Sequence, residues 1–245
     1  MACHFSDDDV RMRVFRSHRA ISISGLLLLF MFTGAVNAVN AGAFAKPSDR
    51  HPDIAALVSL TEEMADHLRD VKANRQAYLD DFTRFEAGPV AVFFQYTSPR
   101  RTLVEIIGAA RFEQLSSEEK RLLVSEMRET YRRYLYEWLH GGLEIKLSPL
   151  EIKEQEAIAQ FERDRVIEVK LRGEISGLPD ITLTAFIAEQ GGEWRAFDFS
   201  FWGLRYSSGK RAAFKRRLER GGAKGLAAYM RDKNTTFFKT LNYSH

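Results

Sequence analysis

The stretch Glu193–Met230, EWRAFDFSFWGLRYSSGKRAAFKRRLERGGAKGLAAYM, contains the features that decide the fold. Its first part alternates with the period of two that is typical of a β-strand, over residues 194–202, and Gly203 ends that strand. The alternation predicts that three aromatic side chains share one face: Phe197, Phe199 and Phe201. Trp194 and Trp202 flank Asp198 on the other face. Because both faces are apolar, we expect protein or a ligand to cover each of them.

A strongly basic tail follows the strand. Residues 204–245 contain 11 Lys and Arg against Glu219 and Asp232, whereas residues 46–203 carry a net charge of −7. The tail reads as two helices, 209–220 and 224–233, separated by two glycines. A basic end on an acidic body indicates an anionic partner, which could be phospholipid headgroups, an acidic protein face or nucleic acid. A solvated helix face with no partner is the alternative.

The region before residue 142 has helical periodicity. Helices are predicted over 53–71, 78–85 and 90–108, the last with a break at Ser98-Pro99. Ser116 and Glu119 have the spacing of a capping box, which predicts a long helix to about Leu139. One apolar stripe follows this helix: Leu123, Met127, Tyr131, Tyr134 and Trp138.

After two glycines at 141–142 the period changes from 3.6 to 2. Strands are predicted over 143–147, 167–171, 181–187 and 194–202, with short turns at 173–179 and 191–192. The predicted fold is therefore α+β, with a helical N-terminal half packed on one face of a four-stranded antiparallel meander and a C-terminal helical tail.

The N-terminus has the order of a secretory signal. An apolar run over 21–36 follows three arginines and precedes small residues, which offer cleavage points after Ala38, Ala43 or Ala45. A membrane anchor is the alternative, but 16 residues are short of the ~20 needed to span a bilayer. We expect residues 1–45 to be the signal peptide and cleavage region, read from Met1 or from Met12, and residues 46–245 to form one domain. The single cysteine, Cys3, lies in the signal, so an exported chain without disulfides indicates a bacterial periplasm.

The residues that could carry chemistry are few. The chain beyond residue 45 has no cysteine nucleophile, no G-x-S-x-G motif and no histidine pair with zincin spacing, so neither a catalytic residue nor a metal site is assigned and no cofactor is expected. Asp198 is the one acid inside an apolar strand, and a buried carboxylate needs partners. Arg205 and Arg211 are the nearby candidates. Asp198 is expected to be a structural contact between strand and tail, with a catalytic acid as the alternative.

In the order of these motifs, the sequence resembles the periplasmic phospholipid-binding MlaC family, whose members are also called toluene-tolerance auxiliary proteins. The resemblance runs over residues 54–230 and rests on W-x-A-F-D at 194–198, followed by Gly203, Phe214 and G-G-A-K-G-L-A-A-Y-M at 221–230. It implies a carrier, not an enzyme, that holds the acyl chains of a phospholipid in a cavity between sheet and helices. The implied partners are an inner-membrane ABC transporter complex and an outer-membrane lipoprotein in a Gram-negative periplasm, without nucleic acid.

The expected cavity lining comes from the strands: Val169, Leu171, Leu183, Ile187, Phe197, Phe199 and Phe201. An ordinary filled core is the alternative for each of these residues. Two other functions stay open, namely an enzyme on an α+β scaffold with Asp198 as acid or base, and an envelope protein that binds an acidic polymer or partner through the basic tail.

Overall fold

A computed structural model of the chain describes residues 63, 66–67, 70–141, 145–155, 166–175, 178–201 and 203–240. The predicted signal peptide over residues 1–45, with its three cleavage points, lies outside the described residues.

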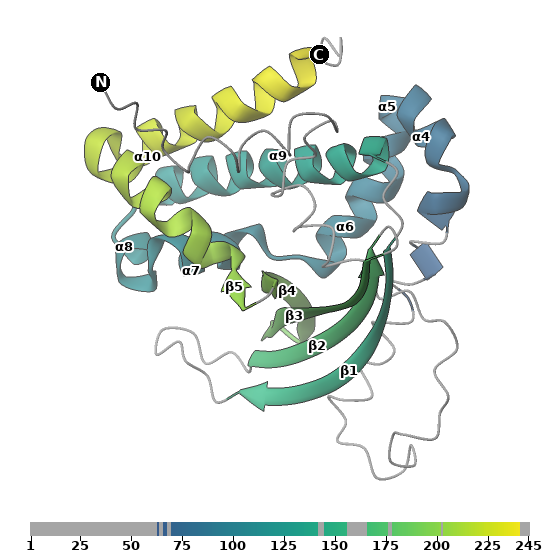
Figure 1. Ribbon diagram of the computed structural model, residues 1–245. Coiled ribbons are helices and arrows are strands. Elements are labelled where there is room, and N and C mark those ends of the chain that lie inside the picture. The colour runs from purple at the N-terminus through teal and green to yellow at the C-terminus, as the bar shows by residue number, and fades with distance from the viewer. Residues whose placement is uncertain are drawn as a thin grey trace, which may run out of the picture.

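The chain folds as an α+β protein in which helices lie above an antiparallel sheet (Figure 1). Six short segments come first: α4 Arg75–Asp80, α5 Phe82–Phe85, the π-helix η2 Glu86–Val90, α6 Ala91–Tyr96, α7 Pro99–Ile107 and α8 Ala109–Glu113. The long helix α9, Ser117–Gly141, then spans the width of the helical layer. The C-terminal helix α10, Tyr206–Thr240, follows the sheet.

Two predicted helix boundaries are confirmed by hydrogen bonds. The Ser116 backbone N–H donates to Glu119 Oε2 at 2.9 Å, and the Glu119 N–H donates to Ser116 Oγ at 3.2 Å, which is the reciprocal pattern of a capping box. The predicted break between α6 and α7 falls at Ser98, whose side chain accepts from the Arg101 N–H and caps α7, with Pro99 in its first turn.

The sheet is a meander in the order β1-β2-β3-β4-β5, and all of its pairings are antiparallel. Its strands are β1 Ile145–Gln155, β2 Val166–Ile175, β3 Leu178–Gln190, β4 Glu193–Phe201 and β5 Leu204–Arg205. The four predicted strands correspond to β1–β4. The two-residue β5 was not predicted, because a pairing this short leaves no alternation in the sequence.

The prediction that Phe197 and Phe199 share one face is wrong. A register shift lies between the two halves of the β3–β4 pairing, where Phe186 opposes Asp198 but Ile187 opposes Ala196. Phe197 is thus the extra residue of a bulge, which interrupts the alternation. Phe199 packs in the main core with the helices, whereas Phe197 belongs to a second buried cluster with Val166, Phe186 and Ala188.

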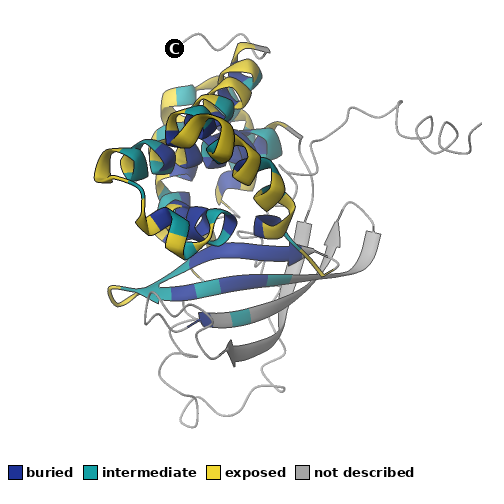
Figure 2. Cartoon of the chain, turned by 90° about the vertical axis from the view of Figure 1, so that its left-hand side faces the viewer, coloured by how far each residue is buried: buried dark blue, intermediate teal, exposed yellow. Residues whose placement is uncertain are grey.

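The edge of β4 is fixed to the helical layer by α7. The Ser98 N–H donates to the Ala196 carbonyl at 2.9 Å. The buried Thr102 hydroxyl donates to the Phe197 carbonyl, and its oxygen is then available to accept from the Tyr131 hydroxyl of α9. This contact joins α7, α9 and β4, and Figure 2 shows the buried strand directly below the helices.

The helix α10 is bent sharply at Gly222, which has φ 58° and ψ −160°. We name residues 206–221 the first arm and residues 223–240 the second arm. The predicted separation of two tail helices at Gly221-Gly222 is confirmed. The second arm returns along α9, so the two arms and α9 enclose a space between them (Figure 1).

We expect Gly222→Ala to lower the free energy of unfolding by about 1–3 kcal/mol, because the backbone conformation of Gly222 is essentially restricted to glycine. A Cβ at this position would meet no atom within 4 Å, so the cost comes from φ and not from a clash. Urea unfolding measures it. Gly221→Ala is the matched control, since Gly221 is helical, without positive φ and equally open, and alanine should there be neutral or stabilising. Equal losses in both variants would contradict the strain at Gly222.

Among the described residues, no helix combines the length and the apolar character needed to cross a membrane.

Candidate binding site between α9 and α10

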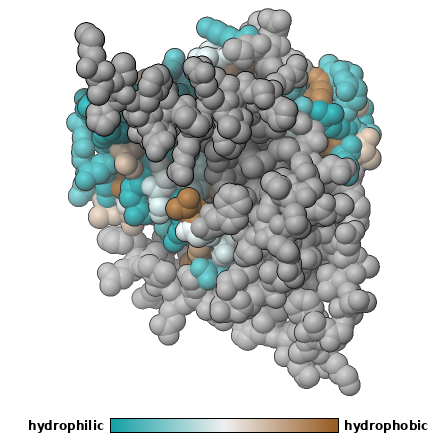
Figure 3. Space-filling view, viewed as in Figure 1, coloured by the Kyte–Doolittle hydropathy of each residue, from teal (hydrophilic) through white to brown (hydrophobic). Residues whose placement is uncertain are grey.

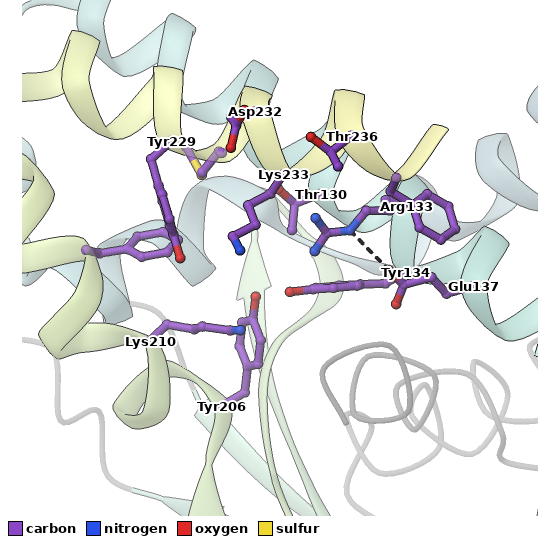
Figure 4. A pocket seen from close by; sticks show the side chains of 13 residues that line it. Thr130, Arg133, Tyr134, Glu137, Tyr206, Lys210, Tyr229, Asp232, Lys233 and Thr236 are labelled. Atoms are coloured by element: carbon purple, nitrogen blue, oxygen red, sulfur yellow. Dashed lines mark ion pairs between the residues drawn. The ribbon is translucent and has the colours of Figure 1, made fainter. Parts of the chain in front are cut away.

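A cavity of about 460 Å³ lies between α9 and the two arms of α10 (Figure 4). Helix α9 contributes four lining residues, Thr130, Arg133, Tyr134 and Glu137. The first arm contributes Tyr206, Lys210 and Phe214, and the second arm contributes Tyr229, Met230, Asp232, Lys233, Thr236 and Phe237. The bend at Gly222 is what brings both arms to the same space.

Aromatic rings form much of the cavity wall. Tyr206 stacks on Phe199 of β4 with ring centroids 5.1 Å apart, so the cavity reaches the sheet through this one ring. Phe214 and Tyr229 meet edge to face across the bend at 6.4 Å. Rings and the Met230 side chain together offer an apolar surface to an acyl chain or another hydrophobic group.

Two lysines enter the cavity from opposite arms of α10 (Figure 4). Lys210 Nζ lies 5.4 Å from the ring centroid of Tyr206, and Lys233 Nζ lies 5.9 Å from that of Tyr229. Each ammonium group is therefore held beside an aromatic face. Both ammonium groups belong to the lining of the same cavity (Figure 4).

The Tyr206 hydroxyl is a buried polar group of the cavity, and the Tyr134 hydroxyl points toward it (Figure 4). Burial, followed by the neighbouring Tyr134 and Tyr131, raises the pKa of Tyr206 well above its ordinary value. The hydroxyl consequently stays protonated, and an anionic oxygen would satisfy it.

Arg133 and Glu137 form an ion pair one turn apart on α9, with Nε and Oε1 separated by 3.4 Å (Figure 4). Burial raises the pKa of Glu137 above its ordinary value, while Arg133 and Lys210 act in the opposite direction. The net charge of the cavity lining therefore becomes more positive when Glu137 takes up a proton.

This raised pKa makes the stability of the folded chain depend on pH. At pH values between the ordinary pKa of a glutamate and the raised pKa of Glu137, the folded state binds more protons than the unfolded state. The contribution of Glu137 to the free energy of unfolding therefore falls as the pH rises through this range. We expect the free energy of unfolding of Glu137→Gln, relative to the parent protein, to increase from acid to neutral pH. Urea unfolding across that range measures the difference, and a difference independent of pH would contradict the prediction.

The structure pairs Asp198 with Arg205 and not with Arg211. Asp198 is fully buried, and Arg205 Nε donates to its Oδ2 at 2.8 Å. Three more donors complete the shell: the Ser207 hydroxyl to Oδ2 at 2.7 Å, the Ser207 N–H to Oδ1 at 3.1 Å and the Phe199 N–H to Oδ1 at 2.9 Å. Arg211 instead donates to the Glu105 carbonyl at 3.0 Å.

Arg205 also lies over the ring of Phe186, with Cζ 4.0 Å from the centroid, and Arg101 of α7 lies over Phe197 at 5.3 Å. Asp198 thus joins β4, β5 and the start of α10 beside the second buried cluster. It is not among the residues that line the cavity between α9 and α10.

Of the predicted lipid-contacting residues, the three whose side chains the structure describes do not line this cavity. Phe199 lies behind Tyr206, Ile187 is partly buried against the main core, and Phe197 is in the second cluster. The backbones of Val169, Leu171, Leu183 and Phe201 are in β2, β3 and β4, where Leu183 opposes both Leu171 and Phe201. Their side chains lie outside the described residues, so their role as lining stays a prediction.

Sequence reasoning missed the cavity because its lining comes from α9 and from both arms of α10, which only the tertiary fold and the bend at Gly222 bring together. Tyr134 was recognised only as part of an apolar stripe, and the lysines only as part of a basic tail. One local pattern in the sequence could have indicated the cavity. Arg133 and Glu137 are four residues apart, which places this charged pair on one side of α9, beside its apolar stripe.

No protein-family model matches the chain, and no curated protein matches its sequence. The chain is similar in structure to a phospholipid-binding protein. That protein is from Ralstonia solanacearum and was solved in complex with a phospholipid; the two chains are 17% identical. The similarity covers 70% of this chain and 94% of that chain, with a TM-score of 0.49. At this level of similarity, the function has to follow from the geometry of the site.

The described residues contain no cluster of three or more His, Cys, Asp or Glu side chains arranged to hold a metal ion.

Proposed function

We propose that the protein is a non-enzymatic periplasmic carrier that binds a phospholipid and moves it between an inner-membrane ABC transporter complex and an outer-membrane lipoprotein. We infer the kind of ligand from the cavity between α9 and α10, because its lining combines aromatic rings with Lys210 and Lys233. Its volume of about 460 Å³ is within the ~300–1,000 Å³ typical of ligand pockets. The export signal expected from residues 1–45 and the motif order over 54–230 support the periplasmic carrier role.

The chemistry of the cavity fits an amphiphile with one acidic group. An acyl chain can lie against the rings of Tyr206, Phe214 and Tyr229, and burial of about a dozen methylene groups at ~0.8 kcal/mol each provides on the order of 10 kcal/mol. The phosphate would lie between Lys210 and Lys233, where the Tyr206 hydroxyl can donate to it. Such binding needs no bond to be made or broken, which is what a carrier requires.

Lipid mass spectrometry of the protein purified from membrane-containing cells tests the ligand class directly. Solvent extraction should release phospholipid in stoichiometric amount. A preparation that folds and carries no phospholipid would count decisively against the carrier.

The position of the ligand is tested by Lys210→Glu combined with Lys233→Glu. We expect phospholipid affinity to fall about tenfold or more, because two cation–phosphate contacts of about 0.7 kcal/mol each are lost and replaced by repulsion. Binding of a fluorescent phospholipid measures it. Lys239→Glu is the control, since Lys239 is exposed on the same helix and does not line the cavity.

The same measurement separates the two locations for the acyl chain. If the strand residues predicted from sequence form the site instead, Ile187→Trp should weaken lipid binding while the double lysine variant leaves it unchanged. That pattern would move the site from the helical cavity to the sheet.

A further inference from the structure

The first arm of α10 presents a concentrated basic surface. Seven of the 16 residues from Arg205 to Arg220 are Lys or Arg, against one acid, Glu219. We define the basic face as five exposed cations that flank and oppose the buried side of this arm: Arg211, Lys215, Arg216, Arg217 and Arg220. The arm runs along the outside of the helical layer, toward the left of Figure 1 and toward the viewer in Figure 2.

The positive charge of this face is not neutralised by its surroundings. Glu219 is shared between Arg111 of α8 at 3.7 Å and Lys215 at 3.9 Å, so one acid serves two cations. Arg216 and Arg220 lie one turn apart, and neither forms an ion pair with another described residue. Residues 46–203 carry a net charge of −7, so the excess positive charge beyond residue 45 is concentrated in residues 204–245.

The arm is held rigidly from behind. Phe214 and Ser207 are buried on its inner side, and Arg217 packs over the ring of Tyr229 at 4.6 Å. Tyr229 lines the cavity. Tyr229 therefore contacts both the basic face and the cavity. A membrane or partner bound to the basic face would lie next to the cavity.

We propose that the basic face docks the protein on an anionic lipid bilayer. Clusters of four to eight Lys and Arg on one side of an amphipathic helix bind acidic headgroups through diffuse electrostatic attraction. The centre of a protein–protein interface is typically enriched in apolar and aromatic side chains. Among the described residues, the exposed large hydrophobic side chain is Leu204 on β5, not a residue of the arm. A fluid layer of phosphates fits a surface that offers charge alone.

Sedimentation with vesicles tests the docking. One set contains phosphatidylcholine with phosphatidylglycerol, and the other contains phosphatidylcholine alone. The parent protein should bind the anionic set, lose that binding as salt is added, and leave the neutral set unbound. The variant Lys215→Ala, Arg216→Ala, Arg220→Ala should partition onto anionic vesicles about a hundredfold more weakly, at roughly fivefold per cation.

The matched control removes three exposed cations from other parts of the chain: Lys72→Ala, Arg84→Ala, Lys239→Ala. It has the same net charge as the test variant, so it should retain most of the binding if the face is the docking surface. The variant Lys215→Arg, Arg216→Lys, Arg220→Lys keeps the charge and should bind like the parent. Near-ultraviolet circular dichroism checks that each variant is folded.

Three results would overturn the proposal: equal binding to both vesicle sets, equal losses in the test and control variants, or binding of duplex DNA in place of anionic vesicles. Docking and carriage are separable, because the phospholipid content of the purified protein reports the cavity independently of vesicle binding. Loss of vesicle binding with bound lipid retained is expected for the test variant.

Discussion

Replacing Asp198 by asparagine should lower the free energy of unfolding by about 3–5 kcal/mol. The carboxylate is fully buried and accepts four hydrogen bonds, from Arg205, from both donors of Ser207 and from the Phe199 N–H. An asparagine of the same shape turns an amide NH₂ toward at least one pair of these donors. It also removes the nearer of the two carboxylates of Arg205, leaving Glu105 Oε2 at 3.9 Å. The loss is large because buried donors of Ser207 and Phe199 lose a charged acceptor and water cannot replace it.

Urea unfolding of Asp198→Asn measures this loss, and two further variants define its origin. Ser207→Ala removes one donor and should cost about 1.5–3 kcal/mol, as expected for a hydrogen bond to a charged group. Asp232→Asn is the control, because Asp232 is exposed and should change stability by less than about 0.5 kcal/mol. A fully stable Asp198→Asn protein would show that the buried carboxylate is not a structural contact, and the alternative of a catalytic acid would regain support.

Phe199→Ala should also lower the free energy of unfolding by about 3–5 kcal/mol. Phe199 is fully buried, stacks on Tyr206 at 5.1 Å and belongs to the main core. Removing the ring costs both its transfer from water and the cavity it leaves. Because Tyr206 lines the binding cavity, the variant should in addition weaken phospholipid binding.

Leu204→Ala is the matched control, since Leu204 is 77% exposed and its truncation should change stability by less than about 0.5 kcal/mol. The loss of stability in Phe199→Ala distinguishes two roles of Phe199, namely a packed core residue and the wall of an open lipid cavity. A loss below about 1 kcal/mol, recovered when phospholipid is added, would identify Phe199 as the wall of an open lipid cavity. A loss that added lipid does not recover identifies it as packed core.

Much of the fold follows from local sequence. The capping box at Ser116 and Glu119, the break at Ser98-Pro99, the four long strands and the two arms of the tail are all marked by patterns within a few residues along the chain, and each appears in the structure. The requirement that a buried Asp198 meet a basic group also followed from sequence, with Arg205 and Arg211 as candidates. The choice between them did not, because it depends on where β5 brings the chain.

The tertiary structure alone decided which residues share a face and which surround the cavity. The bulge at Phe197 depends on the pairing of β4 with β3 and separates Phe197 from Phe199, although a simple period of two places them together. The binding cavity depends on the bend at Gly222, where two adjacent glycines marked a break but did not fix its direction. Local periodicity marks the long helices and strands, whereas the meeting of Tyr134, Lys210 and Lys233 depends on contacts of α9 with both arms of α10, since no local pattern encodes such contacts.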